Sequence, residues 1–164
     1  MNFLYHRALM SGLLLLATQA YADPYMGVEY QNLSGTRTAQ TYSTSQINMV
    51  VGYEWPLMAN VKHAVEYTGP ISSSTGQLGA QNVETTLMSF GYKLTYSGFY
   101  GKAAYVKLDR DDADLEQTKD RVMMYNIGYE HALDDTTTLR ISRDRLSSNV
   151  ISVTGFSVAA LFLF

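Results

Sequence analysis

The sequence predicts an all-β protein: an eight-stranded antiparallel up-and-down transmembrane β-barrel preceded by a cleaved signal peptide. Three observations predict it. Apolar and polar residues alternate with period two almost throughout residues 24–164. The connections between the alternating segments are short and long in turn. One face of most segments is apolar along its whole length, as a lipid-facing strand requires.

Composition excludes several other classes of protein. The chain has 164 residues, 46% hydrophobic and 16% charged, which suits one domain. Its mean hydropathy is -0.10, and no apolar run approaches the roughly 20 residues of a membrane-spanning helix. The absence of cysteine excludes disulfides, a thiolate metal site, a cysteine nucleophile and a lipoprotein anchor. A net charge of -3 gives no electrostatic footprint for nucleic acid.

The N-terminal residues have the pattern of a secretion signal. Arg7 supplies a positive charge, residues 8–17 form an apolar core, and Ala20 and Ala22 make the small-x-small pattern that signal peptidase accepts. About ten apolar residues are too few to cross a membrane core of about 30 Å as a helix. We therefore expect residues 1–22 to be a signal peptide and 23–164 to be the barrel.

Turn-rich stretches divide the mature chain into eight segments of strand length. They are residues 24–33, 46–56, 60–69, 84–96, 99–109, 120–131, 137–145 and 149–164. The connections 56–60, 97–98 and 132–136 are short, whereas 34–45, 70–83 and 110–119 are longer and polar. The seventh connection, 146–148, is short but falls on the side of the long ones. An up-and-down barrel sorts its loops to opposite ends in this way, whereas a Greek-key sandwich does not.

Tyrosines recur near the ends of three segments. Gly-Tyr-Glu at 52–54, Gly-Tyr-Lys at 91–93 and Gly-Tyr-Glu at 128–130 each precede a short turn. A meander places these tyrosines at one height and facing outward, where amphipathic rings prefer a membrane–water interface. The alternative is that Tyr is simply a good strand residue. The predicted aromatic girdle consists of Tyr53, Trp55, Tyr92, Tyr96 and Tyr129.

Charged residues inside the segments occupy the opposite face. They predict a neutralised lumen of four acids and four bases: Glu29, Glu54, Glu66 and Glu130 with Lys62, Lys93, Lys102 and Arg140. The facing of segment 99–109 is ambiguous, because Val106 and Leu108 share a face with Lys102. We expect Lys102 to point inward, since a lysine facing mid-bilayer lipid costs about 2–4 kcal/mol.

The last segment ends in Phe164, preceded at two-residue steps by Phe162, Ala160, Val158 and Phe156. Here the sequence resembles the small eight-stranded outer-membrane barrels of Gram-negative bacteria, of the OmpA membrane-domain and OmpX/Ail types. The resemblance implies that Phe156, Val158, Phe162 and Phe164 form the signal read by the barrel-assembly machinery. The intervening Leu163, Leu161 and Ala159 depart from it, because the family usually has polar groups there. The facing of this strand therefore stays open.

No arrangement of catalytic or metal-binding residues is visible. Lipid A deacylases and palmitoyltransferases resemble this chain in size and use His/Ser arrangements near the outer rim. Neither His63 nor His131 is followed two residues on by Ser, so we expect His63 to be a lipid-facing ring. The acidic run Asp109, Asp111, Asp112, Asp114 and Glu116 fails the calcium-loop pattern, because Asp stands at its sixth and twelfth positions, 114 and 120. The sequence predicts no metal and no cofactor.

The resemblance implies an outer-membrane location, both termini periplasmic, and a structural or surface-interaction role of the adhesion, colonisation or serum-resistance type. It implies a monomer that contacts outer-membrane lipid and lipopolysaccharide, with a possible host or surface ligand at the extracellular loops. The polar stretches 36–46 and 71–77 suit such loops, but solubility alone would also explain them. The alternatives are a lipid-modifying enzyme, which needs a His/Ser/acid cluster, and a narrow channel, which needs a wet lumen.

Overall fold

The computed structural model describes residues 22–37, 40–71, 74–79, 81–111, 119–147 and 151–164. Most of these residues lie in strands, and among them no helix is long and apolar enough to cross a membrane. The strands are β1 (Asp23–Arg37), β2 (Gln40–Met58), β3 (Val61–Pro70), β4 (Ser74–Leu78), β5 (Gln81–Tyr96), β6 (Phe99–Asp111), β7 (Lys119–Ala132), β8 (Thr137–Ser147) and β9 (Ile151–Leu163).

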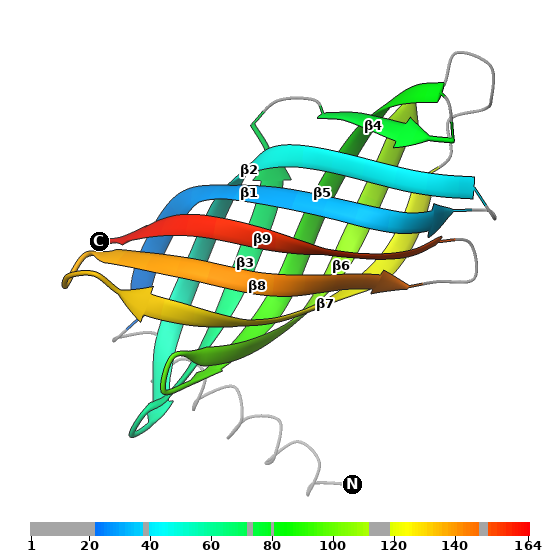
Figure 1. Ribbon diagram of the computed structural model, residues 1–164. Helices are drawn as coiled ribbons and strands as arrows, with labels where there is room; N and C mark the ends of the chain where they lie inside the picture. Colours follow the sequence, from blue (N-terminus) through cyan, green and yellow to red (C-terminus); the bar gives the residue numbers. More distant parts are fainter. Residues whose placement is uncertain (1–21, 38–39, 72–73, 80, 112–118, 148–150) are drawn as a thin grey trace, which may run out of the picture.

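The strands form one closed antiparallel barrel. Each long strand pairs with its neighbours in the chain, and β1 pairs with β9 from Tyr25↔Leu163 to Arg37↔Ile151, so the sheet closes on itself. Figure 1 shows β9 lying between β1 and β8 along the near wall. Among the strands that the structure describes, closure pairs the first with the last, which is the β solution for a chain that spans lipid.

Eight wall positions are occupied, because β3 and β4 share one of them. Both strands lie between β2 and β5: Asn48 pairs with Pro70 of β3, and Thr44 pairs with Gly76 of β4. From Asn48 to Thr44 there are four residues along β2, whereas from Pro70 to Gly76 there are six along the partner segment. The partner segment therefore has two extra residues relative to β2, as in a β-bulge. The prediction that 70–83 is one long loop was therefore wrong, since β4 and the start of β5 lie within it.

Strands also continue into the other predicted loops. β1 and β2 stay paired through residues 34–45 as far as Arg37↔Gln40, so that loop prediction was wrong too. β6 runs to Asp111 and β7 begins at Lys119, which leaves Asp112, Asp114 and Glu116 of the acidic run outside the described residues. The end of the barrel opposite the chain termini, which we call the hairpin end, is thus built largely of paired strands.

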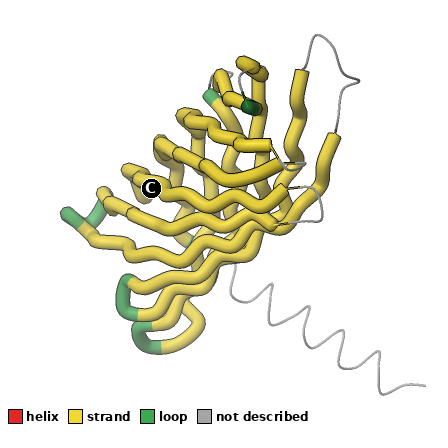
Figure 2. Tube along the Cα trace, turned by 45° about the vertical axis from the view of Figure 1, so that its right-hand side comes forward, coloured by secondary structure: helices red, strands yellow, loops and turns green. Residues whose placement is uncertain are grey.

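The strands are strongly staggered. A line of paired residues that starts at Tyr25 on β1 returns to β1 at Gly35, ten positions further on. The line passes through Gly52, Glu66, Gly91, Ala104, Met124, Leu146 and Val153. Such a stagger on eight strands requires a tilt of roughly 35–45° from the barrel axis. The tilt is plain in Figure 2, where the short turns gather at one end of the tube.

Tight turns close the end that carries the termini, which we call the terminus end. Ser97 and Gly98 connect β5 to β6 with φ of 48° and 87°. Two consecutive positive φ values belong to the hairpin turn whose twist matches that of the strands, and glycine adopts them without strain. In the β7–β8 turn the Asp134 carboxylate accepts hydrogen bonds from the amide and hydroxyl of Thr136, which lower its pKa.

Candidate functional site

Seven charged side chains of alternating sign contact one another in a row inside the barrel, which we call the ion chain. Lys102 Nζ lies 2.5 Å from Glu66 Oε1, and Arg140 Nη2 lies 2.7 Å from Glu66 Oε2. Arg140 Nε and Lys93 Nζ both contact Glu130 Oε1, at 2.9 and 2.6 Å. Lys93 also reaches Glu54 Oε2 at 3.3 Å. The chain ends at Lys62, 2.8 Å from Glu54 Oε1.

Each carboxylate contacts two cations, and every ion of this set has at least one partner of opposite charge. Leaving one buried charge without its partner would cost several kcal/mol. Six strands each contribute at least one member of the ion chain: β2, β3, β5, β6, β7 and β8. The ion pairs therefore connect most of the barrel wall.

Two buried tyrosines, which the sequence analysis did not single out, pack against this chain. Tyr25 donates a hydrogen bond to Glu66 Oε2 at 2.9 Å, and its ring centre lies 5.1 Å from Lys93 Nζ. The Tyr100 ring centre lies 5.1 Å from the Arg140 guanidinium carbon. Aromatic faces attract such cations, the more so away from water.

The glycines of the Gly-Tyr repeats make room for these rings. A Cβ at Gly52 would collide with the Tyr25 ring, and one at Gly128 would meet the Tyr100 ring. Two of the three repeats therefore have two roles, because Gly52 and Gly128 lie beside an inward tyrosine ring while the next residue faces outward. Gly91 instead faces Ala104. The glycine role was not apparent in the sequence, because the partner rings lie on other strands.

Glu29 differs from the other predicted lumen charges. It is buried inside, but among the described residues it makes no ion pair, and it accepts a hydrogen bond from Asn48 Nδ2 at 3.3 Å. The expectation that every lumen acid faces a base is wrong for this residue. The alternation of the sequence predicts that Glu29 faces inward. It does not predict which side chain Glu29 meets across the barrel, because that depends on the stagger of all eight strands.

Asp144 is a fifth lumen acid that the sequence analysis did not single out. It is fully buried and receives hydrogen bonds from Asn126 Nδ2 at 2.6 Å, Ser142 Oγ at 2.8 Å and Gln31 Nε2 at 3.0 Å. Neutral donors on four strands (β1, β7, β8 and β9) surround it, the fourth being Ser157 at 3.4 Å. The sequence does indicate that Asp144 faces inward, because it lies four residues after inward Arg140 in β8 and alternate residues of a strand share a face.

The hairpin end of the lumen is closed by apolar side chains. Successive inward residues of β8 are Arg140, Ser142, Asp144 and Leu146, so the interior passes from charged to polar to apolar along the axis. This apolar plug consists of Leu33, Tyr42, Leu87, Ala104, Val106, Val122, Met124, Leu146, Ile151 and Val153. Lys102 and Val106 both point inward, one into the charged layer and the other into the plug.

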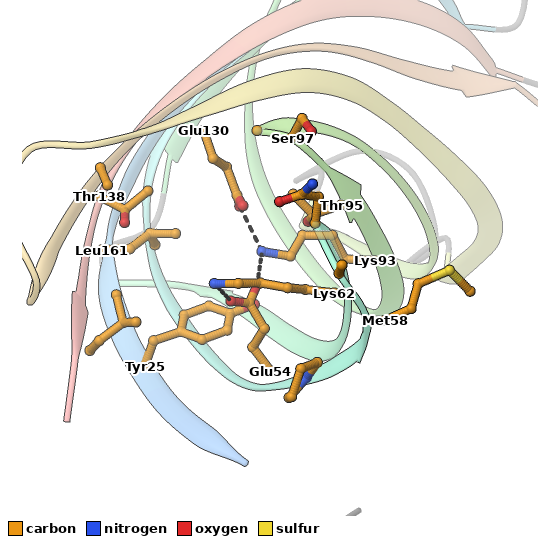
Figure 3. Close-up of a pocket in the computed structure, with 16 residues that line it drawn as sticks. Tyr25, Glu54, Met58, Lys62, Lys93, Thr95, Ser97, Glu130, Thr138 and Leu161 are labelled. Carbon is orange, nitrogen blue, oxygen red and sulfur yellow. Dashed lines mark hydrogen bonds and ion pairs between the residues drawn. The ribbon is translucent and has the colours of Figure 1, made fainter. Parts of the chain in front are cut away.

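The lumen opens only partly at the terminus end. A cavity of about 620 Å³ lies there, with Tyr25, Glu54, Lys93 and Glu130 among its lining residues. Figure 3 shows Lys93 between Glu54 and Glu130, with Lys62 at Glu54 and Tyr25 alongside. The cavity contains equal numbers of acids and bases, Glu54 and Glu130 against Lys62 and Lys93. It is therefore a neutral vestibule whose inner wall is the ion chain.

Aromatic rings cover the outside of the wall at the terminus end. Tyr53 stacks on Trp55 with ring centres 6.4 Å apart, Trp55 lies 5.4 Å from His63, and His63 lies 5.8 Å from Tyr92. Tyr96 and Tyr129 also point outward, and Tyr129 packs on Phe99 at 5.0 Å. The five predicted girdle residues thus lie on the outer wall, joined by two rings not counted among them, His63 and Phe99.

A second group of outward aromatic residues lies toward the hairpin end, and the sequence analysis did not identify it. It consists of Tyr30, Tyr105, Tyr125 and Phe156. Tyr30 and Phe156 lie on paired strands with ring centres 6.2 Å apart. Between the two groups the exposed outer wall is apolar, with Met49, Phe90 and Ile127 exposed in its middle. The pattern is the apolar band with aromatic borders that is typical of membrane barrels.

The facing of β9 is unambiguous in the structure. Phe156, Val158, Phe162 and Phe164 are exposed on the outer wall, whereas Ala159 and Leu161 are buried inside. The inward pair packs in a small apolar cluster with Tyr25, Val50 and Ala64. This cluster explains why the inward residues of the last strand are apolar: they fill the space beside the Tyr25 ring.

The two histidines of the described residues lie on the outer wall, away from the lumen acids. His63 Nδ1 shares a hydrogen bond with Tyr92 Oη at 3.0 Å, and His131 stacks on Tyr129 with ring centres 6.5 Å apart. Both rings are at the terminus end. Within the described ranges, no group of three or more His, Cys, Asp or Glu residues could hold a metal ion.

Comparison with solved structures gives the same architecture. Ail, the attachment invasion locus protein of Yersinia pestis, superposes with a TM-score of 0.58 at 9% identity, over 87% of this chain and 97% of Ail. Neisserial surface protein A superposes with a TM-score of 0.55 at 11% identity, over 85% of this chain and 95% of that protein. The chain has the fold of the small outer-membrane β-barrels. At these identities the likeness concerns the fold alone.

A second structure of Ail, in complex with the heparin analogue sucrose octasulfate, superposes with a TM-score of 0.53 at 8% identity, over 87% of this chain and 97% of Ail. No protein-family model matches the sequence, and no curated protein matches it.

Proposed function

We propose that the chain is an outer-membrane β-barrel protein whose rigid hairpin end faces the outside of the cell and serves a structural or surface-interaction role. The observation that carries the proposal is the wall itself: an apolar outer face bordered by aromatic rings around an interior filled with side chains. In this proposal residues 1–22 are removed as a signal peptide, the mature chain is a monomer, and both termini are periplasmic. The even number of wall strands supports a common side for both ends.

The contents of the lumen favour this role over a channel. The ion chain and the apolar plug occupy the two ends of the interior, and an ion would have to cross both. An eight-stranded barrel is just wide enough for side chains to fill. The positions of His63 and His131 support a non-enzymatic role, because both lie on the outer wall at the terminus end rather than near a nucleophile at the hairpin end.

Surface interaction is supported by the paired strands of the hairpin end. β1 and β2 continue as a ladder to Arg37↔Gln40, and β4 reinforces β5. A rigid scaffold that presents polar tips is the usual arrangement for recognition. We do not propose a sulfated ligand like that of the Ail complex for this chain, because residues 110–119 contain four carboxylates against two basic residues. An adhesion or colonisation ligand for this chain would be uncharged or basic at that surface.

Conductance distinguishes the proposed role from a channel. Refolded protein in a planar lipid bilayer is expected to give no steady conductance above that of the lipid, because the lumen is blocked by the ion chain and the plug. A variant with Leu146 and Val106 both replaced by Ser, which loosens the plug, serves as the positive comparison. It is expected to show brief conductance events more often than the unmodified protein. A large, steady conductance from the unmodified protein would refute the closed lumen.

The C-terminal pattern gives a prediction about assembly. We propose that outward Phe156, Val158, Phe162 and Phe164 are the signal read by the barrel-assembly machinery. Deleting Phe164 is expected to slow membrane insertion in cells and to leave aggregates in the periplasm, as measured by heat-modifiable migration on gels. Deleting the same residue is expected to have little effect on folding into vesicles, where no machinery acts. Normal assembly of the deletion variant in cells would count against the signal.

A further inference from the structure

Basic residues collect on one part of the outer wall, close to the hairpin end. Arg143 and Arg145 of β8 and Arg121 of β7 point outward and are exposed, and Lys107 of β6 lies directly opposite Arg121. We call Arg121, Arg143 and Arg145 the basic band. Within the described ranges none of the three forms an ion pair. The band therefore carries positive charge that this part of the protein does not neutralise.

The register places Arg145 at the upper border of the apolar face and starts Arg143 within that face. Arg145 pairs with Tyr125, one of the outward aromatic residues toward the hairpin end, and Arg143 pairs with Ile127 on one side and Phe156 on the other. Arg143 thus begins beside apolar residues, and its long stem lets the guanidinium reach toward Arg145, two residues further on. Arginine on a lipid-facing wall costs free energy that increases with depth below the border. A phosphate bound at Arg143 would offset that cost.

The rest of the wall makes the placement specific. On the strands that follow β8 around the wall, β9, β1 and β2, the outward residues near the hairpin end are hydroxyl-bearing, among them Ser34, Ser43 and Thr154. Thr154 is the direct partner of Arg145, so the band ends at this side of β8. At the terminus end, the described outward positions carry the rings of His63 and His131 but no Lys or Arg directed at lipid, since Lys62 turns to Glu54. One sector of one membrane border is basic, and no other described sector is.

We infer that the basic band binds the phosphate groups of lipid A, the phosphorylated anchor of lipopolysaccharide, in the outer leaflet. The inference rests on the proposed function, because it needs the hairpin end to lie at the outer leaflet. Guanidinium groups suit phosphate, since their planar fork donates paired hydrogen bonds. Two arginines on the same face of β8, about 7 Å apart along the strand, bring two long cationic side chains within reach of one phosphorylated headgroup. The neighbouring Tyr125 and Phe156 offer ring surfaces beside its sugar and acyl chains.

The test uses the full mature barrel refolded into phosphatidylcholine vesicles. Bisphosphorylated lipid A, monophosphorylated lipid A or phosphatidylglycerol is titrated in, and stabilisation against thermal unfolding is followed by heat-modifiable gel migration. Wild type is expected to respond to bisphosphorylated lipid A at the lowest content, ahead of the monophosphorylated form and of phosphatidylglycerol. The variant Arg143→Gln with Arg145→Gln is expected to need at least about tenfold more lipid A, because two charge-assisted contacts are lost.

The variant Arg143→Lys with Arg145→Lys is the matched control, since it keeps the charge and loses the fork. It is expected to fall between wild type and the Gln variant. Equal responses of wild type and the Gln variant to lipid A would overturn the inference, and so would a wild-type response to phosphatidylglycerol as strong as that to lipid A. Failure of the underlying barrel proposal looks different: no heat-modifiable folded form would appear in any vesicle.

Discussion

Replacing Arg140 with Leu is expected to destabilise the barrel by about 3–5 kcal/mol, the largest effect of any single lumen substitution. Arg140 is fully buried and bridges Glu66 and Glu130. Its removal breaks two buried ion pairs and leaves each carboxylate with one cation in place of two, Lys102 at Glu66 and Lys93 at Glu130. Unfolding by urea in lipid vesicles, followed by tryptophan fluorescence of Trp55, measures the loss.

The same strand supplies the control. Arg143 lies three residues from Arg140 but on the outer wall, and Arg143→Leu makes the same chemical change without touching the ion chain. In vesicles of phosphatidylcholine alone this control is expected to be neutral or slightly stabilising. If the two variants lost equal stability, the ion chain would not be what distinguishes Arg140.

Replacing Ile127 with Lys is expected to cost about 2–4 kcal/mol in vesicles. Ile127 is 74% exposed in the middle of the outer wall, the highest exposure among the large apolar residues described. On a surface that faced water, lysine at so exposed a position would change stability by no more than about 0.5 kcal/mol. The sign and size of the effect therefore report the surrounding medium.

Thr154→Lys provides the comparison for Ile127→Lys. Thr154 is also outward and exposed, but it lies near the hairpin end, beyond Phe156 on β9. A lysine there is expected to cost less than about 1 kcal/mol, because charges near the membrane border are tolerated. A neutral result for Ile127→Lys in vesicles would mean that the middle of the wall does not face lipid.

The period of the sequence was sufficient to predict the eight wall positions and most of the inward and outward faces. Period-two alternation fixes facing as soon as one residue of a strand is placed, and Lys102 placed β6 correctly. The facing of β6 was ambiguous because both of its faces carry apolar residues. Val106 is inward because the hairpin end of the lumen is apolar, and that plug is assembled from residues of seven strands, β1, β2, β5, β6, β7, β8 and β9.

The hairpin end was underestimated because its strands are polar on both faces. Thr41, Ser43 and Ser45 face outward while Thr44 and Gln46 face inward, so hydropathy does not alternate although the backbone pairing continues. The partners of lumen charges were equally out of reach. Glu66 meets Arg140 across the barrel through the stagger of ten residues, and no local pattern encodes that distance.

The central claim is that the hairpin end lies outside the cell while the short turns lie in the periplasm. The absence of native cysteine makes a direct test possible, since a single introduced thiol is the only reactive one. Thr36→Cys places it near the β1–β2 hairpin, and Asp135→Cys places it in the exposed β7–β8 turn. Each is treated on intact cells with a maleimide that does not cross the outer membrane. We expect the thiol at position 36 to be labelled on intact cells and the thiol at 135 only after the membrane is permeabilised. Labelling of position 135 but not 36 on intact cells would contradict the orientation and the surface role that depends on it.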